Sequence, residues 1–216
     1  MIEAMIFLLR AGCPWRDTPV IFGPWNSVYT RWRRWAHCGL WAKLLPILAK
    51  GARGKLRAVD ATHIKVHQHG ANPSGGHTLN AIGRTKGGLN SKLHAVVDGN
   101  GRALALVLTA GQVHELQAAP ELLKSLRSVI VIGDKAYDSD QLANLLTNQD
   151  CQICVPAKAN RRRPLPFHRG WYRKRHHVEN FFQRAKSLRR FATRYDKTGI
   201  CFFATVCLAA VLDWLR

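Results

Sequence analysis

The 216-residue chain is poor in acidic residues, with 13 Asp and Glu against 33 Lys and Arg. The formal net charge is therefore +20 at neutral pH, and a monomer with that imbalance repels itself unless it meets a polyanion. The 47% of hydrophobic residues excludes disorder over most of the length, as well as collagen, coiled-coil and low-complexity proteins. A nucleic-acid enzyme fits these numbers, and a ribosomal or chromatin-like packing protein is the alternative.

The sequence also lacks an apolar run long enough to span a bilayer. The longest, Ile200 to Leu212, has 13 residues and stops at Asp213, whereas a spanning helix needs about 20. We predict a buried C-terminal helix at this position. No signal peptide is evident, because the first segment is amphipathic and contains Glu3 and Arg10. We therefore expect a cytoplasmic protein without a membrane partner.

The six cysteines show no disulfide framework, and a chain of this length needs none. Cys151 and Cys154 form a lone C-x-x-C without a second pair at zinc spacing, so we predict a buried strand that carries two thiols. The histidines at 63, 67 and 69 have no carboxylate or cysteine beside them to complete a metal site. Neither pattern predicts a metal centre.

The positive charge is concentrated in two segments. Residues 1–57 hold ten basic and two acidic residues, and residues 158–190 hold twelve basic residues and one acid. The rest of the chain is nearly neutral. Two basic lobes on either side of a hydrophobic middle are an arrangement that an enzyme acting on nucleic acid can use.

Residues 1–50 are predicted to form a small helical region rich in Trp and Arg. A helix that begins near Ser27 presents Arg31, Arg33 and Arg34 on its polar face. A helix-turn-helix-like DNA-binding region explains this pattern, and an ordinary helical cap on the next domain explains it equally well. Under the first interpretation, the three arginines contact DNA.

After a linker at 50–55, the pattern changes to strands that alternate with helices. Asp98-Gly-Asn-Gly is a strong hairpin signal between two of the strands, and a glycine-rich loop is expected over 70–90. Strands are predicted at 57–66, 93–97, 103–108, 129–132 and 151–155, and helices at 114–126, 139–148 and 171–190. This order predicts an α/β domain over 56–216 with an RNase H-like core, a mixed five-stranded sheet with flanking helices.

Two acids are placed where such a fold can carry chemistry. Asp60 lies within an apolar strand, where a carboxylate is costly to bury unless it finds donors or a cation. Asp134 follows a buried strand, and the carboxyl ends of strands border the crevice in which α/β sheets hold ligands. A solvated carboxylate at a strand end is the alternative for either acid alone. Asp138, four residues further on, is predicted to have a turn or capping role.

The third acid, Glu179, is the only carboxylate among residues 158–190. On an α-helix, Tyr172, Arg175, Glu179 and Lys186 fall within one arc of about 60°. The apolar residues of the same segment occupy a neighbouring arc that would pack on the sheet. One acid framed by three polar partners is better explained by an anionic ligand than by a merely solvated basic helix.

The spacing Tyr172-(2)-Arg175-(3)-Glu179-(6)-Lys186 resembles the signature of DDE transposases of the bacterial insertion-sequence type. Other segments are similar to the group named after insertion element five, within the insertion-element-four-like superfamily, and occur in order along nearly the whole chain. They are Gly12-Cys-Pro-Trp-Arg-Asp17, Gly23-Pro-Trp25, Trp32-Arg-Arg-Trp35, Val59-Asp60-Ala-Thr62, Gly83-Arg-Thr-Lys-Gly-Gly-Leu89, Lys92-Leu-His-Ala95, Thr109-Ala-Gly-Gln112 and Gly133-Asp134-Lys-Ala-Tyr137-Asp138.

The resemblance implies that Asp60, Asp134 and Glu179 are both the catalytic triad and the metal ligands. Three carboxylates can hold two Mg²⁺ ions, for which Mn²⁺ can substitute, about 3.5–4 Å apart on the attacking and leaving oxygens. Arg175 and Lys186 would bind phosphates of the transposon end, and Tyr172 would contact DNA or the carboxylates.

The resemblance also implies the partners. These are double-stranded DNA, at the terminal inverted repeats and at the target, and a second copy of the chain in a synaptic homodimer. The expected location is the nucleoid of a bacterial cytoplasm. The group carries further helical residues before the part that resembles residues 1–41, so we expect this chain to start inside that region. A truncated copy of the element, a late start codon and one product of a split reading frame each explain this, and the function affected is specific recognition of the terminal inverted repeats.

Two other functions fit the same residues. A catalytically incompetent, truncated transposase would bind DNA ends without cutting them. An RNase H-like nuclease would cut branched or hybrid substrates without strand transfer.

Overall fold

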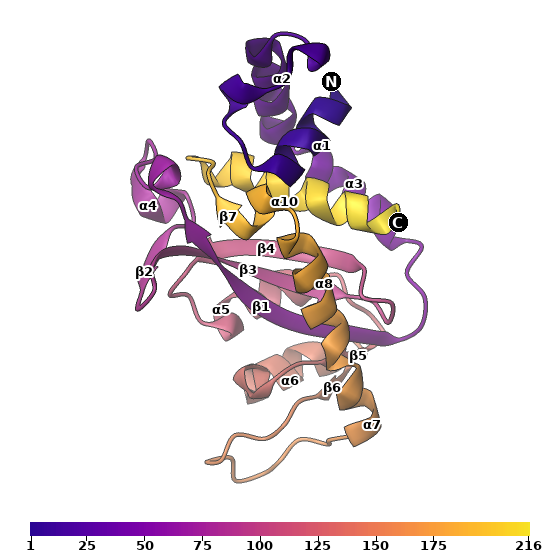
Figure 1. Ribbon diagram of the computed structural model, residues 1–216. Helices are drawn as coiled ribbons and strands as arrows, with labels where there is room; N and C mark the ends of the chain where they lie inside the picture. Colours follow the sequence, from indigo (N-terminus) through magenta and orange to yellow (C-terminus); the bar gives the residue numbers. More distant parts are fainter.

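The computed structural model describes residues 1–216, and a mixed sheet lies at its centre (Figure 1). Strands β1 (Leu56–Val66), β3 (Gly88–Val97) and β4 (Ala103–Ala110) form an antiparallel meander. Strands β5 (Ile130–Ile132) and β6 (Gln152–Cys154) continue the sheet on the other side of β1, in parallel. The order β4-β3-β1-β5-β6 with these directions confirms the predicted RNase H-like core.

Two short strands bring the sheet to seven strands rather than the predicted five. Strand β2 (Gly83–Thr85) pairs with β3 inside the glycine-rich loop, and β7 (Thr193–Arg194) pairs with the end of β1. Neither strand has enough residues to produce an alternating pattern, so the sequence predicted neither. The predicted hairpin at Asp98 and the strand with two buried thiols, Cys151 and Cys154, are confirmed.

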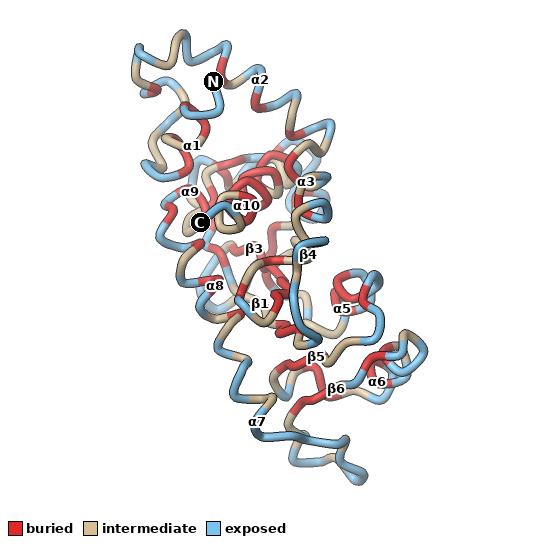
Figure 2. Tube along the Cα trace, turned by 90° about the vertical axis from the view of Figure 1, so that its right-hand side faces the viewer, coloured by how far each residue is buried: buried red, intermediate tan, exposed pale blue.

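Helices cover both faces of the sheet (Figures 1 and 2). One hydrophobic cluster, of 30 buried residues, joins the sheet to α8, α10 and the N-terminal helices, and a second, of 12, joins it to α5 and α6. The helices are α1 (Ile2–Ala11), α2 (Trp25–His37), α3 (Leu40–Ala49), α4 (Gly76–Leu79), α5 (Glu115–Leu123), α6 (Asp140–Thr147), α7 (Arg169–Tyr172), α8 (His176–Lys186), α9 (Arg189–Ala192) and α10 (Gly199–Trp214). Short 3₁₀ turns lie at Trp15–Asp17, Val20–Phe22, Gln68–Gly70, Lys135–Tyr137 and Arg173–Arg175.

Helix α10 is the buried C-terminal helix that the sequence predicted, and it organises the larger cluster. Its 16 residues contact α2, α3 and β4, and ten of them are buried. Through these contacts of α10, the N-terminal helices share a continuous core with the sheet domain. No helix of the structure is both long enough and apolar enough to cross a membrane.

Helix α2 has the predicted division between a buried and a polar side. Val28, Trp32 and Ala36, spaced four residues apart, are buried, and the arginines between them are exposed. Arg31 and Arg34 border a small polar hollow, whereas Arg33 lines a larger cleft toward the sheet domain. The three arginines therefore face two different surfaces.

A fully buried arginine, Arg194, joins the sheet to the segment before α10. Its Nη1 donates to Ser91 Oγ at 2.6 Å and to the carbonyl of Asn80 at 2.7 Å. Its Nε and Nη2 donate to the carbonyls of Asp196 and Lys197, both at 3.0 Å. This one side chain thus satisfies polar groups from β3, the glycine-rich loop and the connection to α10.

Candidate active site

Asp60 lies in the middle of β1, on the face covered by α8. Its Oδ1 accepts a hydrogen bond from the backbone N–H of Ala61 at 2.7 Å, and its Oδ2 accepts one from Arg175 Nη1 at 2.9 Å. Burial raises the pKa of Asp60, and the nearby charges of Asp134 and Glu179 raise it further, against the opposite effects of Ala61 and Arg175. Three carboxylates therefore share one electrostatic environment.

The register of the sheet determines where Asp134 lies relative to Asp60. Strand β5 runs parallel to β1 with Ala58 opposite Ile132, the last residue of β5, so that Asp60 and Asp134 each lie two residues beyond this pair. Asp134 is itself the cap of the next 3₁₀ turn, since its Oδ1 accepts from the N–H of Ala136 at 2.9 Å. Its position is therefore fixed from both sides, by the strand before it and the turn after it.

Gly133 and Tyr137 lie next to Asp134 in the site, and the sequence alone predicted no function for either residue. A Cβ at Gly133 would lie 2.9 Å from the Tyr137 ring and 3.1 Å from Val59, so only glycine fits between them. Tyr137 is 1% exposed and its hydroxyl has no hydrogen-bond partner. Burial and the charges of Asp60, Glu115 and Asp134 raise the pKa of Tyr137, which stays protonated beside the acids.

Glu179 faces Asp60 from the first turn of α8, and Arg175 connects the two. Arg175 Nη2 pairs with Glu179 Oε1, one helical turn away, while Nη1 pairs with Asp60. Burial lowers the pKa of Arg175, but Glu179 and Asp60 together outweigh burial and raise it. The guanidinium is thus a charged bridge between β1 and the helical segment.

Lys186 lies at the other end of α8 and contacts the same strand. Its Nζ donates to Thr62 Oγ1 at 2.7 Å, two residues along β1 from Asp60. Tyr172 lies before α8, with its ring centroid 5.2 Å from that of Phe167. The sequence predicted one continuous helix over 171–190; instead, a 3₁₀ turn precedes α8, and the helix ends at Lys186 before α9 begins.

Several other predicted residues lie elsewhere. The carboxylate of Asp138 is buried, accepts from the N–H of Lys158 at 2.7 Å and pairs with Arg161 at 2.6 Å, so it anchors the basic loop after β6. His67 stacks against His69 with ring centroids 4.5 Å apart. Asp138 follows the 3₁₀ turn at Lys135–Tyr137, close to the turn or capping place predicted for it, but its carboxylate joins this turn to a distant loop.

The donor chemistry of Asp60, Asp134 and Glu179 suits a hard divalent cation, because all three donate carboxylate oxygens. No group of three or more His, Cys, Asp or Glu side chains lies close enough together in this structure to hold a metal ion. Instead, the guanidinium of Arg175 pairs with two of the three acids. A metal ion that draws the carboxylates together therefore has to displace Arg175 from between Asp60 and Glu179.

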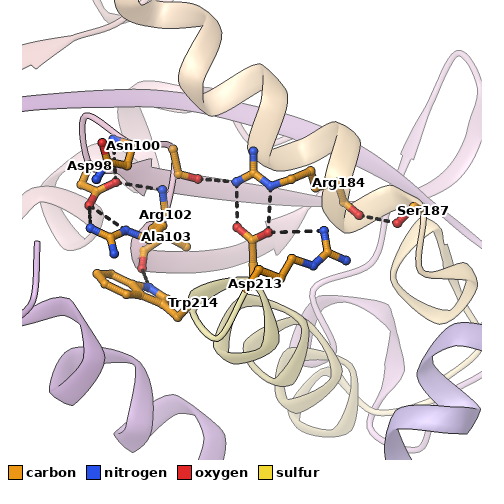
Figure 3. A network of polar contacts seen from close by, with 10 residues as sticks. Asp98, Asn100, Arg102, Ala103, Arg184, Ser187, Asp213 and Trp214 are labelled. Carbon is orange, nitrogen blue, oxygen red and sulfur yellow. Dashed lines mark hydrogen bonds and ion pairs between the residues drawn. The ribbon is translucent and has the colours of Figure 1, made fainter.

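A polar network holds α8 in place behind the site (Figure 3). Arg184 donates from Nε and Nη2 to the two carboxylate oxygens of Asp213, at 2.8 and 2.7 Å, and from Nη2 to the carbonyl of Gly101. Gly101 has a φ of +77°, and a Cβ there would lie 3.0 Å from the carbonyl oxygen of His177. The network therefore ties α8, and with it Glu179, to the β3–β4 hairpin and to the last turn of α10.

We expect Asp213→Ala to lower the free energy of unfolding by about 1–2 kcal/mol, because it leaves the half-buried Arg184 without its carboxylate. Chemical denaturation followed by circular dichroism measures this change. Glu121→Ala is the matched control: Glu121 pairs with Lys124 in solvent, and its loss should change stability by less than about 0.5 kcal/mol. Equal effects of the two substitutions would contradict an anchoring role for Asp213.

The comparison with known protein families decides the relationship. The profile described as "Transposase DDE domain" matches residues 51–212, three quarters of the chain. The chain belongs to the DDE transposase family. Its members are enzymes that cleave and transfer DNA strands. A second profile, "Putative transposase of IS4/5 family", matches residues 1–45 of this transposase, so the predicted insertion-sequence relationship is confirmed.

Two individual relatives are similar to parts of this chain. The transposase is 37% identical over 131 residues to a Brucella ovis protein described as "Putative transposase for insertion sequence element IS6501", covering 59% of this chain and all of the relative. It is 33% identical over 70 residues to the uncharacterized protein y4sN of Sinorhizobium fredii, covering 32% and 56% of the two chains.

Two solved structures of transposases are distantly similar. A piggyBac synaptic complex with hairpin DNA has a TM-score of 0.49 and 13% identity, covering 74% of this chain. This chain spans 46% of the piggyBac chain. The Mos1 strand transfer complex has a TM-score of 0.36 and 10% identity, covering 100% of this chain and 76% of that one.

Proposed function

We propose that this transposase cuts an insertion sequence at its terminal inverted repeats and joins the ends to target DNA, with Asp60, Asp134 and Glu179 as the catalytic carboxylates. The observation that carries the proposal is the placement of these three acids: Asp60 on β1 and Glu179 on α8 share the guanidinium of Arg175, and Asp134 directly follows β5, the strand that pairs in parallel with β1. A carboxylate inside an apolar strand needs donors or a cation, and a bound metal ion would take over the part that Arg175 now plays for Asp60 and Glu179.

The reaction is an exchange of phosphodiester bonds in two steps. Water attacks the phosphorus at the element end, so that one P–O bond forms as another breaks and a 3′-hydroxyl is released. That hydroxyl then attacks a target phosphodiester in the same way. When two Mg²⁺ or Mn²⁺ ions are bound, they supply activation of the attacking oxygen and stabilisation of the leaving oxygen. Asp60, Asp134 and Glu179 would hold those ions.

The basic residues around the carboxylates would bind the DNA. Arg175 and Lys186 lie on the same side of the α8 segment as Glu179, and both already contact β1, so a phosphate that replaces those contacts lies directly at the site. Tyr172 precedes them. On α2, Arg33 lines the larger cleft and Arg31 and Arg34 line the small polar hollow, and we propose that all three also contact DNA. We further propose that two copies act together on paired ends, in the bacterial nucleoid.

The experiment is the joining of a pre-cleaved element-end oligonucleotide to supercoiled plasmid in Mg²⁺, with an EDTA control. The oligonucleotide takes its sequence from the inverted repeats that flank the gene. Joined product that depends on Mg²⁺ supports the proposal. DNA binding without joining would instead support an end-binding protein, a function favoured by the Arg175 bridge between two of the acids. Preferential cutting of branched or hybrid DNA would support a nuclease.

A further inference from the structure

A second hollow in the molecule is separate from the carboxylates. It has a volume of about 760 Å³, within the range of roughly 300–1,000 Å³ that is usual for ligand sites. One wall comes from the loop before α2 and from α2 itself, and the other from the segments that follow β1 and β7. We call it the aromatic cleft. Its lining residues come from α2 and the segment before it and from the segments next to β1 and β7, elements that are labelled in Figure 1.

Aromatic rings line both walls. On the α2 side, Trp25 and Tyr29 lie beneath the guanidinium groups of Arg16 and Arg33, at 5.4 and 6.0 Å from Cζ to the ring centroid. On the sheet side, the ring centroids of His67 and Tyr195 are 4.8 Å apart. Trp25 is 36% exposed. Partly exposed rings with arginine above them are the usual platform for the bases of single-stranded nucleic acid.

The charges of the cleft favour an anion. Arg16, Arg33, Arg190 and Lys197 line it, against one acid, Asp196, whose carboxylate already accepts from Thr205 Oγ1 at 3.0 Å. Arg190 is 5% exposed; it donates from Nη1 to the carbonyl of Cys13 and pairs from Nη2 with Asp196 at 3.6 Å, yet its Nε has no hydrogen-bond partner. A buried guanidinium N–H at the wall of a positive cleft is a donor that a bound ligand can use.

We propose that the aromatic cleft binds unpaired nucleotides of single-stranded DNA, an inference that rests on the proposed action on DNA ends. His67 directly follows β1 and is seven residues from Asp60, about 23 Å along an extended strand. At the duplex rise of about 3.4 Å per nucleotide, this distance corresponds to roughly seven nucleotides from a phosphate at Asp60, and an extended single strand covers it in fewer. The cleft thus supplies a base-stacking site beside a phosphate-binding site.

The test measures binding in EDTA, so that it does not depend on catalysis. The probes are a fluorescein-labelled oligo(dT) dodecamer and a duplex of the same length, followed by anisotropy. We expect Tyr195→Ala and Trp25→Ala each to weaken dodecamer binding about tenfold and to leave duplex binding unchanged. The dependence of affinity on salt should stay the same, because no charge is removed. The matched control is Ile21→Ala, an apolar side chain 88% exposed in the same region but outside the cleft.

A direct readout uses the same dodecamer with one 2-aminopurine, whose fluorescence falls on stacking. Quenching by the unaltered protein that is relieved in Tyr195→Ala supports the proposal. Unchanged dodecamer binding in both variants, or equal weakening of dodecamer and duplex, would overturn it. Two further probes distinguish the source of the unpaired nucleotides: a duplex with a 5′ overhang represents the donor end, and a duplex with an internal bubble represents melted target DNA. If the Tyr195→Ala and Trp25→Ala variants bind both probes as tightly as the unaltered protein does, the proposal is also overturned. Failure of strand joining with cleft binding intact would leave this inference standing.

Discussion

Asp134→Asn should lower the rate of strand joining at least about a thousandfold, equivalent to about 4 kcal/mol of activation free energy. The substitution removes one negative charge from a site at which three carboxylates would hold the metal ions. It keeps the fold, since an asparagine Oδ1 can still accept the hydrogen bond from the N–H of Ala136 that caps the following turn. The measurement is the initial rate of joined product in the plasmid assay.

Two comparisons make this result specific. DNA binding measured in EDTA should be preserved or strengthened in Asp134→Asn, because the variant repels phosphate less. Glu121→Gln, which changes an exposed acid on α5 that pairs only with Lys124, should join DNA at the unaltered rate. A joining rate for Asp134→Asn within tenfold of the unaltered enzyme would place the catalytic carboxylates elsewhere.

Arg194→Met should lower the free energy of unfolding by at least about 3 kcal/mol. Methionine keeps much of the volume of the arginine side chain, but it leaves the Ser91 hydroxyl and the carbonyls of Asn80, Asp196 and Lys197 without their donor in a fully buried place. Burial lowers the pKa of Arg194 to about 10, so the guanidinium is still charged at neutral pH. The hydrogen bonds to these acceptors offset the free energy that burial of this charge costs. Urea unfolding measures the change.

The exposed Arg53→Met serves as the control, with an expected change within about 0.5 kcal/mol. Arg194→Lys should fall between the two, since a lysine can reach some of the acceptors but not all four. If Arg194→Met proves too unstable to purify, Arg194→Lys still decides the matter. A loss of less than about 1 kcal/mol in Arg194→Met would contradict the role of this side chain as a buried connector.

The parts of this molecule that the sequence predicted are those with strong local patterns. The apolar run at Val129–Ile132 produced a strand at Ile130–Ile132, and the hairpin signal at Asp98 produced the β3–β4 turn. The approach of Asp60 and Asp134 also follows from sequence, because Asp60 lies on β1 and Asp134 directly follows β5, and an RNase H-like core places these two strands side by side. Their catalytic role remains a prediction.

The features that the sequence did not predict depend on contacts between distant segments. Arg175 was predicted to face phosphate, but in the absence of DNA its nearest anions are Asp60 and Glu179, and it pairs with both. The bond from Lys186 to Thr62 and the buried place of Arg194 join residues more than one hundred positions apart. The pattern of residues along the chain does not predict such pairs, because each pair depends on how the helices pack on the sheet.

The anchoring of α8 by Asp213 also bears on biosynthesis. Arg184 is translated 29 residues before Asp213. While the chain grows on the ribosome, the segment that carries Glu179 has emerged but its carboxylate partner on α10 has not. In a nascent chain that lacks α10, the α8 segment is held on β1 only by contacts such as those of Arg175 with Asp60 and of Lys186 with Thr62. If the three acids are the catalytic ones proposed above, we expect full activity only after α10 has been made and packed.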